Sequence, residues 1–148
     1  MLTSHQLQLA VRDYECDLQG VVNNAVYQHY LEHARHELLK VWQIDFAQLT
    51  ESGVMLVVVR AELDYLGSLK SGDSFTVCTY LERLSRLRFA FHQSIVKFGD
   101  NKRILDAIII ATGVNKLGKP YLPEQLLPLL AAYETESTKN KITDRKNL

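Results

Sequence analysis

The sequence is poor in cysteine, carries no net charge and has no long apolar run, and each of these shortages excludes a class of protein. Its 148 residues include only two cysteines, Cys16 and Cys78, which rules out a disulfide framework, and no CxxC or Cys/His metal spacing is present. Lys plus Arg and Asp plus Glu each number 17, which argues against binding nucleic acid or an anionic membrane through bulk charge. The longest apolar runs, Val54–Val59 and Ala107–Thr112, are too short to span a membrane.

What is present fits one globular domain. Hydrophobic residues make up 47% and charged residues 23% of the chain, close to the globular average, so disorder and fibrous repeats are not expected. Residues 1–15 contain no apolar signal core, because Gln, Arg and Asp interrupt them. We therefore expect a cytoplasmic protein with reduced thiols. Residues 1–133 are expected to form the domain, and residues 134–148, which are nearly all polar, a flexible tail.

The hydrophobic pattern changes from a strand period to a helix period early in the chain. Leu7 and Leu9 alternate with polar neighbours, which is typical of a half-buried strand. Residues Ala25–Trp42 then show an apolar stripe with the period of an amphipathic helix, and either Asn23 or Asn24 is its expected N-cap. The stripe consists of Tyr27, Tyr30, Leu31, Ala34, Leu38, Val41 and Trp42.

The second half of the chain is rich in strand signals. A helical turn over Phe46–Ser52 is expected to end at Gly53. Four strands are expected, separated by turn signals, over Val54–Leu66, Ser74–Leu84, Leu87–Phe98 and Ile104–Asn115. Pro123 and Pro128 are expected to bracket a short closing helix. One long helix with a long antiparallel sheet predicts an α+β domain, and the uncovered face or edge of that sheet is a candidate surface for a partner subunit.

The densest functional signal lies in Tyr14–Arg35, YECDLQGVVNNAVYQHYLEHAR. It resembles the signature of hotdog-fold acyl thioesterases of the 4-hydroxybenzoyl-CoA thioesterase type. The matching positions are Asp17, Gly20, Val21, Val22, Asn23, Asn24, Tyr27, Glu32, Ala34 and Arg35. The block Val57–Asp73 resembles a second stretch of that family, and the similarity covers roughly residues 6–123. The stretches VRDYECDLQGVVNNAVY and HARHELL are especially similar to plant acyl-lipid and methylketone-pathway thioesterases of the superfamily.

This resemblance implies both an architecture and an activity. The implied fold is a hotdog fold, one long central helix wrapped by a five- or six-stranded antiparallel sheet. The implied assembly is a homodimer or homotetramer whose subunits join their sheets and whose active sites lie between subunits. The implied reaction is hydrolysis of a fatty or aromatic acyl thioester to a free acid and a thiol. It needs no metal or redox cofactor, and coenzyme A or the phosphopantetheine of an acyl carrier protein enters only as part of the substrate.

The residues that precede the long helix fit thioester chemistry on physical grounds. A thioester carbonyl needs a nucleophile or activated water on one side and donors for the developing oxyanion on the other. Free N–H groups at a helix N-terminus stabilise negative charge, so we expect the Asn24 N–H to contact the thioester oxygen. Gly20 permits the tight turn before it. Asp17 is expected to act as nucleophile or general base, although a turn-capping role would be the simpler interpretation without the resemblance.

Further residues are expected to contact the substrate. These are Tyr27, Leu31, Val57, Asp64, Tyr65, Arg86 and Arg88. The first three would lie beside the acyl chain. Arg86 and Arg88 carry guanidinium groups, which bind phosphate oxygens bidentately, so they are candidates for holding coenzyme A or the phosphopantetheine arm. An exposed strand face kept soluble by charge is an equally good interpretation of these two arginines.

Other interpretations of the sequence were weighed. His29 and His33 belong to an H-x-x-E-H motif, as in some metalloproteases, but both fall on the polar side of the helix and no third ligand is indicated. A hotdog dehydratase is disfavoured, because those relatives pair a His with an acid in a different motif. Two alternatives stay open: an acyl-carrier-protein thioesterase, and a non-catalytic acyl-binding or interaction module that would not need the carboxylate of Asp17.

Overall fold

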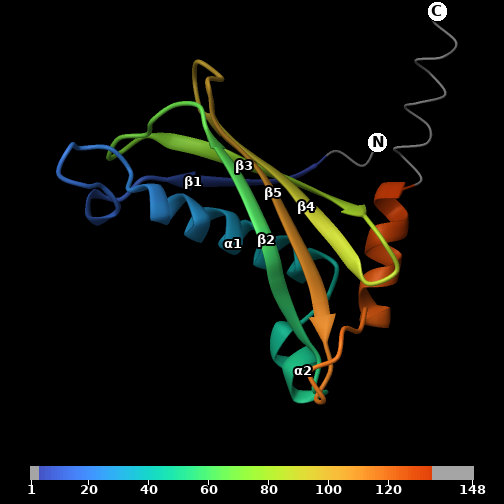
Figure 1. Ribbon diagram of the computed structural model, residues 1–148. Coiled ribbons are helices and arrows are strands. Elements are labelled where there is room, and N and C mark those ends of the chain that lie inside the picture. The colour runs from blue at the N-terminus through green and yellow to red at the C-terminus, as the bar shows by residue number, and fades with distance from the viewer. Residues whose placement is uncertain (1–3, 135–148) are drawn as a thin grey trace, which may run out of the picture.

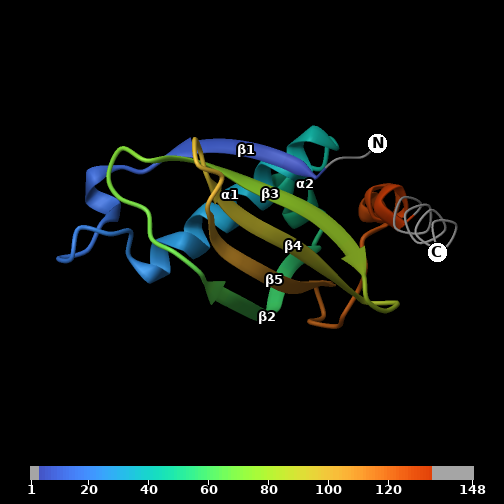
Figure 2. The same ribbon diagram turned by 90° about the horizontal axis from the view of Figure 1, so that it is seen from above.

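The computed structural model describes residues 4–134, in which five antiparallel strands wrap around one long helix (Figures 1 and 2). The elements are β1 (His5–Ala10), a 3₁₀ turn (Asp13–Glu15), α1 (Asn24–Val41), α2 (Phe46–Glu51), β2 (Met55–Tyr65), β3 (Ser74–Arg83), β4 (Arg88–Lys97), β5 (Arg103–Val114) and a second 3₁₀ turn (Glu124–Leu126). The strand order is β1-β3-β4-β5-β2. This confirms the predicted α+β hotdog fold. The predicted tail over residues 134–148 lies outside the described residues except for Glu134, which ends a helix.

Helix α1 begins at a side-chain cap and buries one side. The Asn23 Oδ1 accepts a hydrogen bond from the Ala25 N–H at 2.9 Å, which makes Asn23 the N-cap. The predicted burial of Val41 is wrong, since its side chain is 67% exposed. Leu39 is buried instead, because Ile44 N–H donates to Leu39 O at 2.9 Å and folds the chain back over that side of the helix. The buried residues are Tyr27, Tyr30, Leu31, Ala34, Leu38 and Leu39.

The core lies between α1 and the inner face of the sheet. Alternate residues of β1 are partly buried, which confirms the predicted half-buried strand. On the longer strands the fully or nearly fully buried apolar side chains include Phe75, Val77, Leu81, Phe89, Phe91, Ile95, Leu105 and Ile109. Burying one side chain of this kind stabilises the fold by about 1.5–3 kcal/mol. The sheet therefore holds α1 in one place across its inner face.

The C-terminal segment packs near the end of β3 (Figures 1 and 2). The predicted helix between Pro123 and Pro128 is wrong in extent, because residues 127–134 continue as helix after the second 3₁₀ turn. Pro128 is tolerated there because the first turn of a helix needs no N–H from it. A Cβ at Gly113 would lie 1.9 Å from Tyr121 O, so only glycine permits this segment to approach β5 so closely.

Strand β2 forms one edge of the sheet and is unusually exposed. It pairs with β5 on one side only, with a register shift between Val58 and Arg60. Val58 and Val59 are 50% and 44% exposed, and Arg60 forms an ion pair with Glu62. An eleven-residue edge strand with exposed valines presents unpaired backbone groups to another chain. Within residues 4–134, no helix has the length and apolar character to cross a membrane.

Candidate active site

A tight hairpin carries Asp17 directly to the start of α1. Cys16 forms a bridge opposite Val22, and the Asp17 N–H donates to Val21 O at 2.8 Å. The Gly20 N–H donates to Asp17 O at 3.0 Å, and Gly20 has a φ of 77°, a left-handed conformation that favours glycine. The sequence prediction of a tight turn at Gly20 is confirmed.

The carboxylate of Asp17 is exposed and makes one hydrogen bond. Its Oδ1 accepts from the Gln19 N–H at 2.8 Å, which is the turn-capping bond expected of an Asp in this position. Among the described residues, Oδ2 has no hydrogen-bond partner. One oxygen thus holds the turn while the other is open to a substrate or a water. Turn capping and catalysis are therefore compatible in this geometry.

The first free N–H of α1 is that of Asn24. The Ala25 N–H donates to the side chain of Asn23, and the Val26 N–H donates to Asn23 O at 2.9 Å. Within residues 4–134, no acceptor is found for the Asn24 N–H. A helix N-terminus with an unpaired N–H attracts developing negative charge, and the helix dipole adds to that attraction. Asn24, which was predicted from the sequence to be the oxyanion donor, therefore has a free N–H to donate.

Two tyrosines fix the start of α1 against the sheet. The Tyr27 hydroxyl accepts a hydrogen bond from the Leu69 N–H, and the Tyr65 hydroxyl donates to Asn24 O, each at 3.2 Å. Their rings meet edge to face with centroids 5.8 Å apart. Burial raises the pKa of the Tyr27 hydroxyl, and its hydrogen bond with the Leu69 backbone acts in the opposite direction. Tyr27 and Tyr65, both predicted as site residues, lie together beside Asn24.

A groove of about 380 Å³ runs between α1 and β2 from the first turn of the helix. Its apolar floor includes Ile109 of β5 and Leu31, which was predicted from the sequence to contact the substrate. Val58 and Ala61 line the β2 side, in place of the predicted Val57. Figure 2 shows the end of β2 beside the start of α1. The groove therefore begins at the first turn of α1, next to Asn24.

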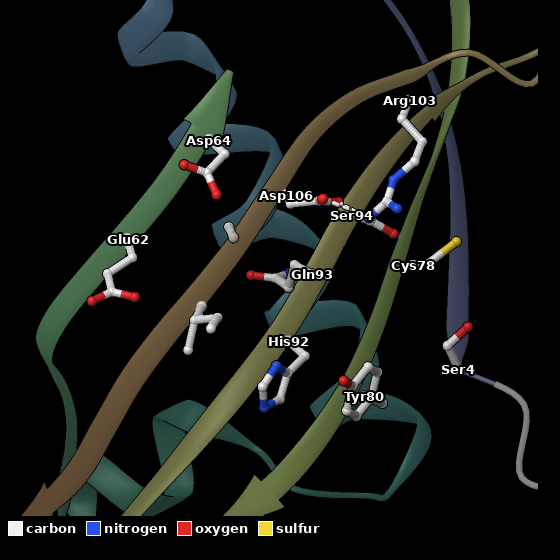
Figure 3. A pocket seen from close by; sticks show the side chains of 12 residues that line it. Ser4, Glu62, Asp64, Cys78, Tyr80, His92, Gln93, Ser94, Arg103 and Asp106 are labelled. Atoms are coloured by element: carbon white, nitrogen blue, oxygen red, sulfur yellow. Dashed lines mark hydrogen bonds and ion pairs between the residues drawn. The ribbon is translucent and has the colours of Figure 1, made fainter. Parts of the chain in front are cut away.

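Four predicted residues lie apart from this site. Asp64 stands opposite Asp106 on the outer face of the sheet, in a separate hollow of about 380 Å³ that Arg103 also lines (Figure 3). Arg88 and Val57 both pair with Thr112, at the end of the sheet remote from Tyr65, which pairs with Leu105. Arg86 lies in the turn next to Arg88. Within one subunit, then, the arginines do not reach Asp17.

Sequence reasoning missed Gln93, a buried amide beneath α1. Its side chain is 4% exposed, and its Nε2 donates to Leu31 O and Thr79 Oγ1 at 3.0 Å each. Its Oε1 accepts from Arg35 Nη1, also at 3.0 Å. The available signal was a glutamine at an inward position of an otherwise apolar strand, FAFHQSIV.

The histidines of the H-x-x-E-H motif face solvent. His29 and His33 are both exposed, as predicted for the polar side of the helix. Between Ser4 and Glu134, no three side chains among His, Cys, Asp and Glu are grouped so that they could hold a metal ion. The chemistry available at the site is that of a carboxylate and a free backbone donor.

A long helix wrapped by antiparallel strands, with a carboxylate-bearing hairpin at its start, defines a hotdog-fold protein. The chain belongs to the thioesterase-like superfamily, because the sequence model of that family matches residues 11–129. This confirms the family resemblance predicted from the Tyr14–Arg35 signature.

Individual relatives support the same placement. The chain is 38% identical over 116 residues to the chloroplastic acyl-acyl carrier protein thioesterase ATL3 of Arabidopsis thaliana, a match that covers 78% of this chain and 61% of that protein. It is 30% identical over 104 residues to the long-chain acyl-CoA thioesterase FadM of Escherichia coli, covering 70% and 78%. The chain thus spans less than two thirds of the plant relative's length.

The fold is also found in solved structures. Slr0204, a 1,4-dihydroxy-2-naphthoyl-CoA thioesterase from Synechocystis, superposes with a TM-score of 0.82 at 18% identity, over 85% of this chain and 94% of that one. At this identity the likeness establishes the fold alone.

Proposed function

We propose that this protein hydrolyses an acyl thioester to a carboxylic acid and a thiol. The observation that carries the proposal is that the hairpin and the helix start over residues 17–24 hold two groups that thioester hydrolysis needs. These are the exposed Asp17 carboxylate, with one oxygen unbonded among the described residues, and the Asn24 N–H, which has no acceptor among them. Membership of the thioesterase-like superfamily and the names of the matched relatives support the same reaction.

The reaction can run by two routes at this site. In one, Asp17 takes a proton from a water that attacks the carbonyl carbon, the Asn24 N–H stabilises the oxyanion, and the thiolate leaves and is protonated. In the other, Asp17 attacks the carbonyl to form an anhydride and release the thiolate, and water then cleaves the anhydride. Both routes convert one thioester and one water into one acid and one thiol.

The thiol is coenzyme A or the phosphopantetheine of an acyl carrier protein. The name of FadM supports the first carrier and that of ATL3 supports the second. ATL3 is chloroplastic, whereas a cytoplasmic location remains the prediction for this chain. Cys16 and Cys78 are both free, as a reducing compartment would keep them.

We further propose that the protein acts as a homodimer joined along β2. The strand has one unpaired edge and exposed valines, which a second copy would cover by antiparallel pairing. Arg88 pairs with Thr112 and Tyr65 pairs with Leu105, seven residues away on β5, so Arg88 lies about 23 Å along its own sheet from the end where Tyr65 contacts Asn24. If β2 of one subunit pairs with β2 of the other, the β4 strand of the second subunit lies three strand spacings, or about 14 Å, from β2 of the first. The arginines would then serve the site of the opposite subunit.

This arrangement predicts complementation between two inactive variants. Subunits with Asp17→Asn are mixed with subunits carrying Arg86→Glu and Arg88→Glu, and the dimers are allowed to exchange. A mixed dimer holds one complete site if the arginines act across the interface, so mixing should restore up to about a quarter of wild-type activity. Activity that stays at the average of the two parents would contradict the arrangement, and native mass spectrometry confirms that mixed dimers formed.

The experiment that tests the function is release of thiol from a panel of acyl thioesters. The panel contains acyl-CoA and acyl-carrier-protein substrates from short to long aliphatic chains and one benzoyl thioester. Turnover that depends on Asp17 supports the hydrolase and identifies the preferred carrier. Absence of turnover on every substrate, with tight binding of the acyl group, would instead indicate a non-catalytic acyl-binding module.

A further inference from the structure

One row of side chains connects the thioester site to a partly buried arginine. Asn24, Gln28, Leu31 and Arg35 stand at positions i, i+4, i+7 and i+11, which share one side of a helix. Gln28, Leu31 and Arg35 all line the groove between α1 and β2. Arg35 comes eleven residues after Asn24, which corresponds to about 16 Å along the helix. The groove therefore leads from the thioester site past Arg35.

The guanidinium of Arg35 has more donors than partners. A guanidinium carries five N–H donors, yet Nη1 donates to Gln93 Oε1 and no other acceptor is found among the described residues. The guanidinium carbon lies 5.7 Å from the centroid of the Phe91 ring. Burial lowers the pKa of Arg35, and Glu32 acts in the opposite direction. Arg35 is thus partly desolvated, with N–H groups left for a ligand.

Gln93 holds this guanidinium in place. Both hydrogens of its amide are used, one by Leu31 O and one by Thr79 Oγ1, so its oxygen is the group left to face Arg35. Because the amide is nearly fully buried, it has no room to turn toward solvent. The arginine is therefore positioned before any ligand arrives.

Glu32 supplies an acceptor in the same groove. Its carboxylate lines the groove with Arg35, and its side chain is 56% exposed. An acyl chain with a terminal carboxylate would be repelled by Glu32, and a plain methyl end would offer no acceptor to the donors of Arg35. A hydroxyl can accept a hydrogen bond from Arg35 and donate one to Glu32, so it matches both side chains.

We propose that this groove selects acyl groups that carry a hydroxyl remote from the thioester, bound by Arg35 and Glu32. The inference rests on the proposed thioester hydrolysis at Asp17. Because helical side chains lean toward the N-terminus, the guanidinium lies about 10–16 Å along α1 from Asn24. A hydroxyl adjacent to the thioester carbonyl does not reach it, whereas one toward the far end of a longer chain does.

The test compares matched substrates. The wild type hydrolyses straight-chain acyl-CoA thioesters and their terminally hydroxylated counterparts of equal length. At each length, the kcat/KM of the hydroxylated substrate is divided by that of the unsubstituted one. We expect a ratio of about ten at the best length, the effect of a hydrogen bond to a charged group. Arg35→Met should bring the ratio to about one. Lys40→Met, which removes an exposed lysine of α1 paired with Glu37, should leave the ratio unchanged.

A second variant covers the chance that Arg35→Met does not fold. Glu32→Leu changes an exposed side chain and should also lower the ratio. A wild-type ratio of one at every length overturns the inference while leaving the proposed hydrolysis intact. If no thioester is hydrolysed, the free acids are compared by calorimetry with Arg35→Met and wild type. Equal binding of plain and hydroxylated acids overturns the inference, and preferential binding of the hydroxylated acid that is lost in the variant supports it.

Discussion

Replacing Asp17 with Asn is expected to lower kcat by roughly 10²–10⁴-fold, the range for loss of a positioned base or nucleophile. Asn cannot take a proton or attack the carbonyl at neutral pH. Its side-chain oxygen can still accept the Gln19 N–H that Asp17 accepts now, so the hairpin and the melting temperature should be unchanged. The measurement is steady-state thiol release with the best substrate of the panel, beside thermal unfolding of both proteins.

Asp13→Asn is the matched control. Asp13 lies in the 3₁₀ turn four residues earlier and accepts a hydrogen bond from the Ser71 hydroxyl. It has the same charge and lies in the same segment before α1, but the proposed mechanism gives it no role. Asp13→Asn should leave kcat within about twofold of the wild-type value, which is the usual behaviour of a surface substitution. Equal losses in the two variants would mean that general charge near the helix, and not Asp17 itself, supports turnover.

Replacing Asn24 with Pro is expected to lower kcat by roughly 10²–10³-fold, the effect of removing one oxyanion donor. Proline has no N–H, and the first position of a helix is where it is best tolerated. The preceding residue must be extended, and Asn23 already has φ −59° and ψ 137°. The substitution therefore deletes one backbone donor while the helix keeps its cap. Because the donor acts on the transition state, kcat should fall more than KM changes.

Asn24→Ala separates the backbone from the side chain. It keeps the N–H and removes only the amide, so turnover should stay close to wild type. A large loss in Asn24→Ala would assign the role to the side chain and contradict the backbone proposal. Circular dichroism of both variants establishes that α1 is intact, and the Tyr65 hydroxyl retains its acceptor, Asn24 O, in both.

Much of the fold follows from local pattern. The predicted helix Ala25–Trp42 agrees with α1 to within one residue at each end, and the four predicted strands agree with β2 to β5 equally well. The period of apolar residues and the turn residues between them are properties of short segments, so sequence alone reveals them. Val41 is an exception, because its exposure depends on where the chain folds back at Ile44.

The site was only partly accessible to the same reasoning. Asp17, Gly20 and Asn24 lie within eight residues, so a local motif and the properties of a helix start were enough to group them. Gln93 and Arg35 come from elements 58 residues apart, and no local pattern links them. Asp64 and Tyr65 were both predicted to line the site, but successive residues of a strand point to opposite faces, so only Tyr65 reaches the start of α1.

The sequence by itself determined the fold class, the family and the position of the hairpin that carries Asp17, because each depends on residues close together in the chain. Only the tertiary structure decided which side chains share a cavity. It placed Arg88 at the far end of the sheet and joined Arg35 to Gln93 beneath α1. The physical reason is that strand register and helix docking are set by packing of the whole core, which a linear pattern does not specify.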